Sequence, residues 1–372
     1  MTRDVLVIGG GLAGGAAALR LARAGRDVLL LERTPGPHDK VCGEFLSYEA
    51  QEELHDLGLD LRSLGAVPIR TAAVDGPRAR SATPLPFEGL SLSRRVLDEA
   101  LLGRAAAAGA EVRRGARATA LERAGSDWSV RVEGGTGLAA REVILATGKH
   151  DLRGQRRPPG PQADLLGFKM YWTLAEPEDL DGRVELHLFP GGYAGLQTVE
   201  GPRANLCLVI RRTAFAALGA TWDALLARLI EGSPALAARL AGATPCLARP
   251  LAISAVPYGL VQDHSDGLWR LGDQAAVIPS FTGEGMSIAL HSARKAADGL
   301  VAGEAPEAFQ RRLAAELRGQ VRRSTLISRA LVTPWAQMAV TPFLTPSVLR
   351  WVLRRTRIPE TARGWSVAVE GP

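Results

Sequence analysis

A glycine-rich turn after the first apolar segment constrains this chain more than any other feature. Residues 5–8 are apolar, and they run into three glycines with the spacing G-x-G-x-x-G, after which residues 16–24 have the composition of a helix. In such a strand–turn–helix unit the glycines permit the tight turn, leave room for a pyrophosphate and let the helix pack against the strand. The start of the helix offers unpaired N–H groups to the phosphates. We therefore predict a dinucleotide site that includes Gly9, Gly11, Leu12, Ala13 and Gly14.

A second apolar segment, residues 27–31, ends at the acidic residue Glu32. Counted from the second glycine of the turn, Glu32 stands where a carboxylate accepts hydrogen bonds from an adenosine ribose. Arg33 follows directly and is expected beside the same ligand. Strand, turn, helix, strand and acid together are much more specific than a glycine pattern alone.

The composition excludes several classes of protein. The 372 residues, 46% of them hydrophobic, suit two or three soluble domains with a sizeable core. Only four of the 45 basic side chains are lysines, a bias that fits genome composition better than a nucleic-acid surface, so no nucleic-acid partner is expected. The three cysteines form no metal pattern and predict a reducing, cytoplasmic environment without a metal. No apolar run approaches the roughly 20 residues of a membrane span. Because the N-terminus leads directly into the first strand, we expect no cleaved signal.

Three later segments carry a resemblance to a known family. A loop leads into Lys40-Val-Cys-Gly-Glu44, an apolar segment ends at Ala146-Thr-Gly148, and residues 269–290 contain Gly272-Asp273, Pro279 and Gly283-Glu-Gly-Met286. With the N-terminal turn, these segments resemble the FAD-dependent oxidoreductases of the aromatic-hydroxylase and geranylgeranyl-reductase type. Those proteins share a glutathione-reductase-like FAD domain, so the resemblance implies FAD as the cofactor.

The resemblance also implies an α/β fold. We expect a Rossmann-like FAD-binding domain with an inserted antiparallel-sheet substrate domain and a helical C-terminal region. The expected boundaries are 1–160 for the first part of the FAD-binding domain, with strands over the flavin at about 65–92, then 161–250 for the substrate domain, 251–310 for the second part of the FAD-binding domain and 311–372 for the helical region.

The family's pattern places further residues beside the cofactor. The loop from Lys40 runs along the flavin, the arginine at the start of helix 91–106 points at the phosphates, and the third segment contacts the ribityl chain and the flavin edge. Glu44 is read either as an acid near the ring or, as we favour, as a charge at a helix N-terminus. The cofactor-binding residues implied in this way are Lys40, Val41, Cys42, Gly43, Arg94, Ala118, Ala146, Thr147, Gly148, Gly272, Asp273, Pro279, Gly283, Gly285 and Met286.

Two residues are candidates for a catalytic role. Cys42 would lie near the flavin, with an apolar filler as the equal alternative, and Tyr193 stands in what reads as a glycine-flanked turn at 191–195. The segment at Tyr193 resembles the reductases' Y-x-W-x-F-P region, but Gly195 and Gln197 replace Trp and Phe. No W-x-W-x-I-P stretch typical of flavin halogenases occurs.

The resemblance leaves three functions open. The first is a monooxygenase of secondary metabolism that hydroxylates an aromatic or polyketide-like apolar small molecule through a flavin C4a-peroxide, with NADH or NADPH as electron donor. Thr147 stands where many hydroxylases carry an acid associated with nicotinamide binding, which weakens direct reduction by NAD(P)H. The alternatives are an FAD-dependent reductase or dehydrogenase of a lipophilic, prenyl-like substrate, and a non-catalytic flavoprotein electron carrier.

The C-terminal part has an unusual composition. Residues 327–357 combine apolar groups, prolines, Trp335, Phe343 and Trp351 with a basic end. We favour a cap on the substrate domain, with peripheral contact to a membrane or a carrier protein as the alternative.

Overall fold

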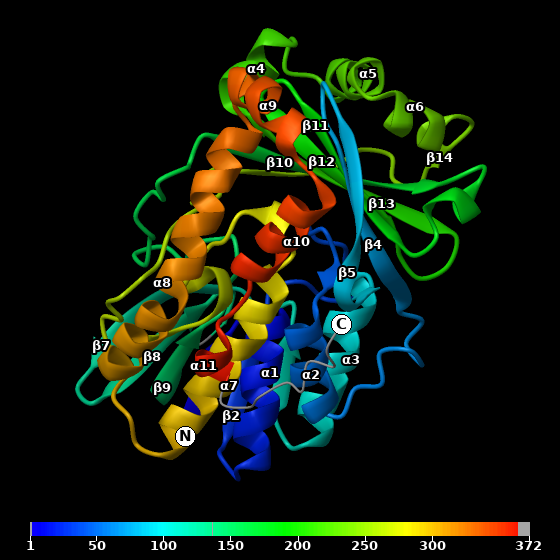
Figure 1. The fold of residues 1–372 in the computed structure, drawn as a ribbon. Helices are drawn as coiled ribbons and strands as arrows, with labels where there is room; N and C mark the ends of the chain where they lie inside the picture. Colours follow the sequence, from blue (N-terminus) through cyan, green and yellow to red (C-terminus); the bar gives the residue numbers. More distant parts are fainter. Residues whose placement is uncertain (1, 136, 364–372) are drawn as a thin grey trace.

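A mostly parallel sheet of seven strands, the smaller sheet, forms one layer of the molecule (Figure 1). The computed structural model describes residues 2–135 and 137–363. The strand order is β6-β2-β1-β9-β8-β7, and β16 also pairs with β9. Strands β1, β2, β6, β9 and β16 run parallel, whereas β7, β8 and β9 form an antiparallel meander. The strands are β1 (Thr2–Ile8), β2 (Val28–Glu32), β6 (Glu111–Arg114), β7 (Ala118–Ala124), β8 (Asp127–Val132), β9 (Leu138–Leu145) and β16 (Trp269–Arg270).

Helices cover this sheet because its central strands are apolar on both faces, as in parallel sheets generally. Helix α1 packs between α3 and α7, and its small residues Ala16, Ala17 and Ala18 are fully buried at that contact. The side chain of Ser93 caps α3 by accepting a hydrogen bond from the backbone N–H of Val96. These helices are α1 (Leu12–Arg23), α2 (Tyr48–Asp56), α3 (Arg94–Ala107) and α7 (Gly285–Val301).

The larger sheet has nine strands and stands above the first layer in Figure 1. Its order is β14-β10-β13-β12-β11-β4-β5-β3, with β15 also paired to β10. One face packs against α5 and α6, while the other faces the first layer. The strands are β3 (Phe45–Leu46), β4 (Val67–Asp75), β5 (Arg80–Ser91), β10 (Leu165–Thr173), β11 (Arg183–Phe189), β12 (Gly192–Thr198), β13 (Arg203–Arg211), β14 (Thr244–Pro245) and β15 (Leu251–Ser254). The helices after β13 are α4 (Arg212–Ala217), α5 (Trp222–Gly232) and α6 (Pro234–Leu240).

The segment expected as a turn at 191–195 is a strand instead. Strand β12 pairs with β11 and β13, and only Pro190 and Gly191 remain in the hairpin loop. A Cβ on Gly192 would lie 2.2 Å from the carbonyl oxygen of Val209. Glycine composition here therefore reflects close strand packing rather than a turn. The second part of the FAD-binding domain was expected to begin at residue 251. Residues 251–254 instead form β15, which pairs with β10 in the larger sheet.

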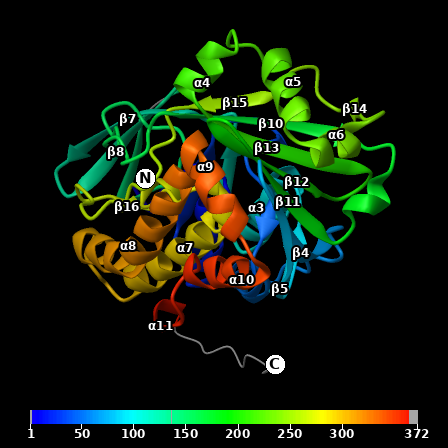
Figure 2. The same cartoon turned by 45° about the horizontal axis from the view of Figure 1, so that its top comes forward.

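The C-terminal region is helical, and Figure 2 shows α9 and α10 crossing the face between the two layers. Helices α8, α9 and α10 each begin with proline, which suits the first helical position because its missing N–H has no partner there. Within the described ranges, no helix has the length and apolarity needed to span a membrane. Residues 364–372, the last part of the region expected to be helical, lie outside the described residues. The elements are η1 (Pro177–Leu180), η2 (Gly272–Gln274), η3 (Ser280–Thr282), α8 (Pro306–Leu331), α9 (Pro334–Val340), η4 (Thr341–Phe343), α10 (Pro346–Arg355) and α11 (Glu360–Arg363).

Candidate functional site

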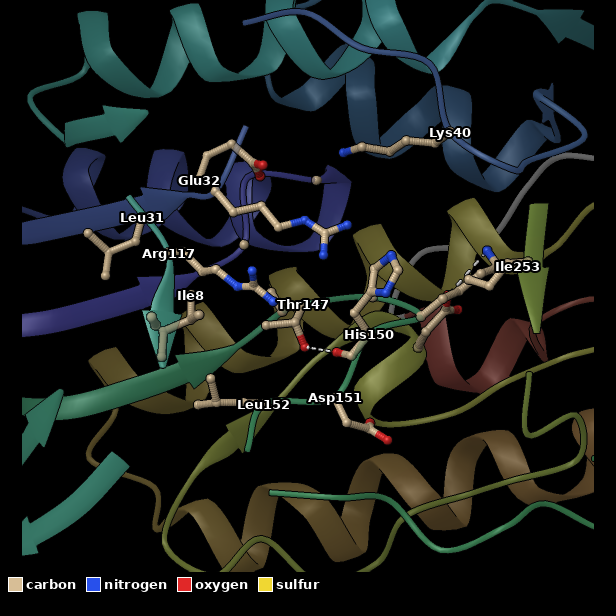
Figure 3. Close-up of a pocket in the computed structure, with 18 of the residues that line it drawn as sticks. Ile8, Leu31, Glu32, Lys40, Arg117, Thr147, His150, Asp151, Leu152 and Ile253 are labelled. Carbon is tan, nitrogen blue, oxygen red and sulfur yellow. Dashed lines mark hydrogen bonds and ion pairs between the residues drawn. The ribbon is translucent and has the colours of Figure 1, made fainter. Parts of the chain in front are cut away.

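Two adjoining cavities lie between the layers. The polar cavity has a volume of about 1070 Å³ and is lined at the carboxyl ends of β1 and β2, where ligands bind in open α/β sheets. Figure 3 shows the side chains of Glu32, Lys40 and Arg117 around it. The apolar cavity, of about 290 Å³, extends from Cys42 beneath the larger sheet. Gly11 and Arg94 line both cavities, so the two form one continuous site.

The glycine turn has a geometry that only glycine satisfies. Gly9 has φ of +109°, and a Cβ there would lie 2.4 Å from the carbonyl oxygen of Ala146. A Cβ on Gly14 would lie 1.9 Å from the carbonyl oxygen of Gly9. Gly11 is the N-cap of α1 and has no side chain to cap the helix, so the first N–H groups of α1 remain available to a ligand.

Two cations meet in front of this helix N-terminus. A Cβ placed on Gly11 would be 3.2 Å from Nη2 of Arg94 and 3.6 Å from Nζ of Lys40. Both cations contact Asp98, at 2.6 Å from Lys40 Nζ and 2.8 Å from Arg94 Nε. Burial acts to raise the pKa of Asp98, but Arg94 and Lys40 outweigh it and lower that pKa. The positive end of α1 and two cations against one carboxylate leave a net positive site, which fits a pyrophosphate.

Glu32 is held at the end of β2 with its carboxylate in the polar cavity. Its Oε2 accepts a hydrogen bond of 2.8 Å from the Gly10 N–H, and its Oε1 accepts one of 2.9 Å from the Thr34 N–H. Burial acts to raise the pKa of Glu32, but the Thr34 hydrogen bond and the charge of Lys40 lower it. The group is therefore an ionised acceptor with lone pairs left over, as ribose hydroxyls require.

The other end of the site combines a second ion pair with a second helix N-terminus. Lys149 Nζ lies 3.4 Å from Asp273 Oδ2, and the charge of Asp273 raises the pKa of Lys149 in spite of its burial. Gly283 adopts the left-handed conformation, with φ of +70°, two residues before α7 begins at Gly285. No side chain caps that helix, so its N–H groups remain available to the electron-rich edge of a bound ring. The two glycine turns, the cation pair and Glu32 together fit an adenine dinucleotide.

A buried ionic network lies behind the loop that carries Cys42. Glu44 and Lys169 are both fully buried and are 2.6 Å apart. The Tyr171 hydroxyl donates to both carboxylate oxygens of Glu44, at 2.7 and 2.8 Å. The Arg94 N–H and the Asn205 amide donate to the same carboxylate. Burial raises the pKa of Glu44 although these partners oppose the shift. The carboxylate does meet a helix N-terminus, because Arg94 is the first residue of α3, but it is also held in a fully buried ion pair.

This network fixes the position of Cys42. Glu44 adopts a left-handed φ of +63°, which is unusual for a residue with a side chain and is held by its buried partners. The Asn205 amide donates to the carbonyl oxygens of Cys42 and Gly43, both at 3.0 Å. Cys42 is half-buried at the apolar cavity, whereas burial raises the pKa of the neighbouring Cys207 thiol to about 12. Cys42 lies on the loop that the Glu44 network holds beside the apolar cavity.

Tyr193 lies on β12 and faces the apolar cavity. Its hydroxyl is 3.1 Å from the Ser280 hydroxyl and accepts a hydrogen bond from the Phe281 N–H. Burial raises the pKa of Tyr193, so the residue is a neutral hydrogen-bonding wall of the cavity rather than a base.

The structure brings nearly all the sequence-predicted residues to one site. Gly14 and Pro279 do not line the cavities, although Gly14 permits the turn and Pro279 stands beside Ile278 and Ser280, which do. The residues that line at least one cavity are Gly9, Gly11, Leu12, Ala13, Glu32, Arg33, Lys40, Val41, Cys42, Gly43, Arg94, Ala118, Ala146, Thr147, Gly148, Tyr193, Gly272, Asp273, Gly283, Gly285 and Met286.

Sequence reasoning missed three parts of the site. Lys169 is one of only four lysines and stands in an apolar strand, a signal that could have singled it out. Lys149 follows the expected Thr147-Gly148 pair directly. Leu349 and Leu353 of α10 line the apolar cavity, but no local pattern announces that contact because it depends on how α10 crosses the larger sheet.

Comparison with known proteins agrees with this geometry. Residues 2–145 match the FAD binding domain family. The menaquinone reductase of Mycobacterium tuberculosis is 30% identical over 319 residues, which are 79% of this chain and 76% of that protein. Digeranylgeranylglycerophospholipid reductase 1 of Methanopyrus kandleri is 32% identical over 325 residues, 82% of each chain. Among solved structures, a flavin-dependent brominase superposes with a TM-score of 0.78 at 18% identity, covering 96% of this chain and 93% of that one. That last likeness concerns the fold alone.

Proposed function

Because this chain belongs to the FAD-dependent oxidoreductases of the aromatic-hydroxylase and geranylgeranyl-reductase type, we propose that it reduces carbon–carbon double bonds in the isoprenoid chain of a lipid or quinone. The relatives with at least 30% identity over most of their length carry the names of reductases, of menaquinone and of a digeranylgeranyl lipid. This supports the second of the three functions predicted from the sequence. Hydroxylation remains the alternative prediction.

The observation that carries the proposal is the apolar cavity that begins at Cys42. Aliphatic side chains from both sides line it, among them Val74, Leu186 and Val209 of the larger sheet and Val352 of α10. Such walls match a hydrocarbon chain and exclude water from the reacting bond.

The residues divide the work of reduction. When bound in reduced form, FAD would supply the hydride that goes to one carbon of the double bond. The Cys42 thiol would donate its proton to the other carbon, so that the double bond becomes a single bond with two added hydrogens. Arg94 lies beside the same cavity: burial acts to lower the pKa of Arg94, but Asp98 and Cys42 together raise it. Water reprotonates the sulfur once the product has left.

Two positions distinguish this cavity from the reductases' sequence pattern. Gly195 and Gln197 line it where that pattern carries Trp and Phe. The Gln197 amide donates a hydrogen bond of 2.5 Å to the Ser91 hydroxyl, so it is held against the wall. A missing aromatic pair leaves the cavity wider at β12, and we therefore expect a bulkier group near the reacting bond than that pattern would accept.

The test uses the FAD-loaded protein reduced with dithionite under nitrogen, so that no electron donor has to be known. Geranylgeranyl lipid and menaquinone in detergent are the substrates, and mass spectrometry follows the products. We expect products with two added hydrogens per reduced bond. In heavy water both should be deuterium, because the flavin hydride and the thiol proton each come from groups that exchange with solvent. Cys42→Ala should lose product formation while keeping its flavin spectrum, and Cys246→Ala, at an exposed cysteine away from the site, should not.

The other two functions give different results in this experiment. Addition of one oxygen atom on exposure to air, without reduction under nitrogen, would establish the monooxygenase. If the flavin is reduced and reoxidised but no lipid is altered, the electron-carrier function is the one that the result supports.

A further inference from the structure

We propose that the surface formed by α9, η4 and α10 docks on a membrane that contains anionic lipids. The exposed side chains that define this docking surface are Trp335, Met338, Val340, Phe343, Val348 and Trp351. The proposal concerns binding and goes beyond the reaction proposed above.

The docking surface gathers apolar groups that a folded chain normally buries. The described residues expose nine large hydrophobic side chains, and six of them fall between 335 and 351. Trp335 is 75% exposed, Phe343 is 72% exposed and Trp351 is 56% exposed. A concentration of exposed aromatic residues of this kind marks an interaction site.

These side chains are not simply unpacked ends of the chain, because their elements are anchored. The Gln337 side chain of α9 donates hydrogen bonds to the carbonyl oxygens of Phe189 and Gly192, at 2.8 and 3.1 Å. A Cβ on Gly76, in the turn between β4 and β5, would lie 2.3 Å from the Thr341 methyl group, so η4 packs tightly on that turn. The surface is therefore presented by a fixed framework.

The C-terminal end of α10 is anchored as well. Arg357 pairs with Glu49 of α2 and lies 3.9 Å from the centre of the Phe87 ring. On the other face of the same helix, Leu349, Val352 and Leu353 line the apolar cavity. Because that inner face is already in use, Val348 and Trp351 have no place in the core.

The charge of this region identifies the partner as anionic. Between residues 317 and 359 the sequence has no acidic residue and eight arginines. Arg350 and Arg354 are exposed on α10, directly before and shortly after Trp351. Tryptophan beside arginine is the composition of a helix that lies in the headgroup region, where the ring enters the acyl boundary and the guanidinium contacts phosphate.

Docking in this way would place α10 between the bilayer and the apolar cavity. If the proposed function holds, the isoprenoid chain would pass from the membrane along α10 to Cys42. This path rests on the proposed function, whereas the docking itself does not.

The experiment is flotation of the FAD-loaded full chain with vesicles, without substrate. Vesicles of phosphatidylcholine alone are compared with vesicles that also contain phosphatidylglycerol. We expect the protein to float with the anionic vesicles. The variant W335S/F343S/W351S should bind them roughly 100-fold more weakly, because three rings no longer enter the acyl boundary. R350Q/R354Q should weaken binding by about fivefold per charge. The matched control I230S/V301S, at exposed apolar positions outside the docking surface, should float like the wild type.

Three outcomes would overturn the proposal. They are failure of the wild type to float with anionic vesicles, undiminished flotation of W335S/F343S/W351S, and an equal loss in I230S/V301S. The flavin content of each variant shows that it has folded. Reductase activity on detergent-dispersed lipid is measured separately, so a protein that floats but does not reduce the lipid refutes the proposed function and leaves the docking intact.

Discussion

Replacing Lys169 by methionine tests whether the buried network is held by its ion pair. Methionine keeps much of the length and volume of the lysine stem but leaves Glu44 without its cation. Removing one partner of a buried ion pair costs about 3–5 kcal/mol, because the other charge stays buried and uncompensated. Since Tyr171, Asn205 and the Arg94 N–H still donate to Glu44, we expect a loss at the lower end of that range, about 3 kcal/mol.

The loss should depend on pH in a definite direction. Burial already raises the pKa of Glu44 above its ordinary value, and without Lys169 that pKa rises further. A group with a raised pKa in the folded state contributes its full stability below the unfolded pKa and loses it as the pH rises through the folded pKa. Lys169→Met should therefore be far less stable than the wild type at a pH of about 8. The difference in stability should shrink as the pH falls toward the pKa of glutamate in the unfolded chain.

The assay is urea unfolding of the FAD-loaded protein across this pH range, at one fixed concentration of free FAD. Lys295→Met is the matched control, because Lys295 lies 3.3 Å from Glu316 in a partly exposed pair and should lose less than about 1 kcal/mol at any pH. Equal stability of Lys169→Met and the wild type near pH 8, or a loss that does not change with pH, would refute the reasoning.

Three further changes have defined outcomes. Gly14→Ala should lower the affinity for FAD roughly tenfold or more, since its Cβ would meet the Gly9 carbonyl; flavin absorbance after gel filtration measures this, and full retention would contradict it. The pKa of His187 is raised, because Asp75 and Glu185 outweigh its burial. The stability that His187 contributes is therefore present below its unfolded pKa and is lost as the pH rises through its folded pKa. His187→Gln should lower the urea midpoint at acidic pH and flatten the pH dependence of that midpoint. An equal lowering of the midpoint at every pH would disprove this. Gly195→Trp has room for its Cβ, 3.7 Å from the Cys207 carbonyl oxygen, so it should retain FAD while kcat/KM for an isoprenoid substrate falls on the order of tenfold. Unchanged kinetics would show that β12 does not border the substrate.

The sequence predicts this fold well where one residue type alone meets a steric demand. The turn at Gly9 and Gly14 is of this kind, because no side chain fits against the neighbouring carbonyl groups. The α/β architecture with a helical C-terminal region is confirmed, because buried parallel strands read as continuous apolar runs. The larger sheet, expected to be antiparallel, is mixed, since β11 pairs in parallel with β4.

Prediction fails where a residue takes its role from a distant part of the chain. Glu44 reads locally as a charge before a helix, yet Lys169, more than a hundred residues later, decides its surroundings. Strand β12 was hidden because its glycines indicate a turn unless the strand packed beside them is known. The cavity wall at Leu349 depends on the path of α10 across the molecule, which no periodicity within that helix encodes.

The position of α10 has a consequence for assembly. The described strands of both sheets precede this helix in the sequence. The wall that α10 gives to the apolar cavity is therefore synthesised after the two sheets. Arg357 then fastens the helix to α2 and completes the enclosure. FAD can therefore enter the nascent chain before α10 closes the apolar cavity, without an opening motion of the finished molecule.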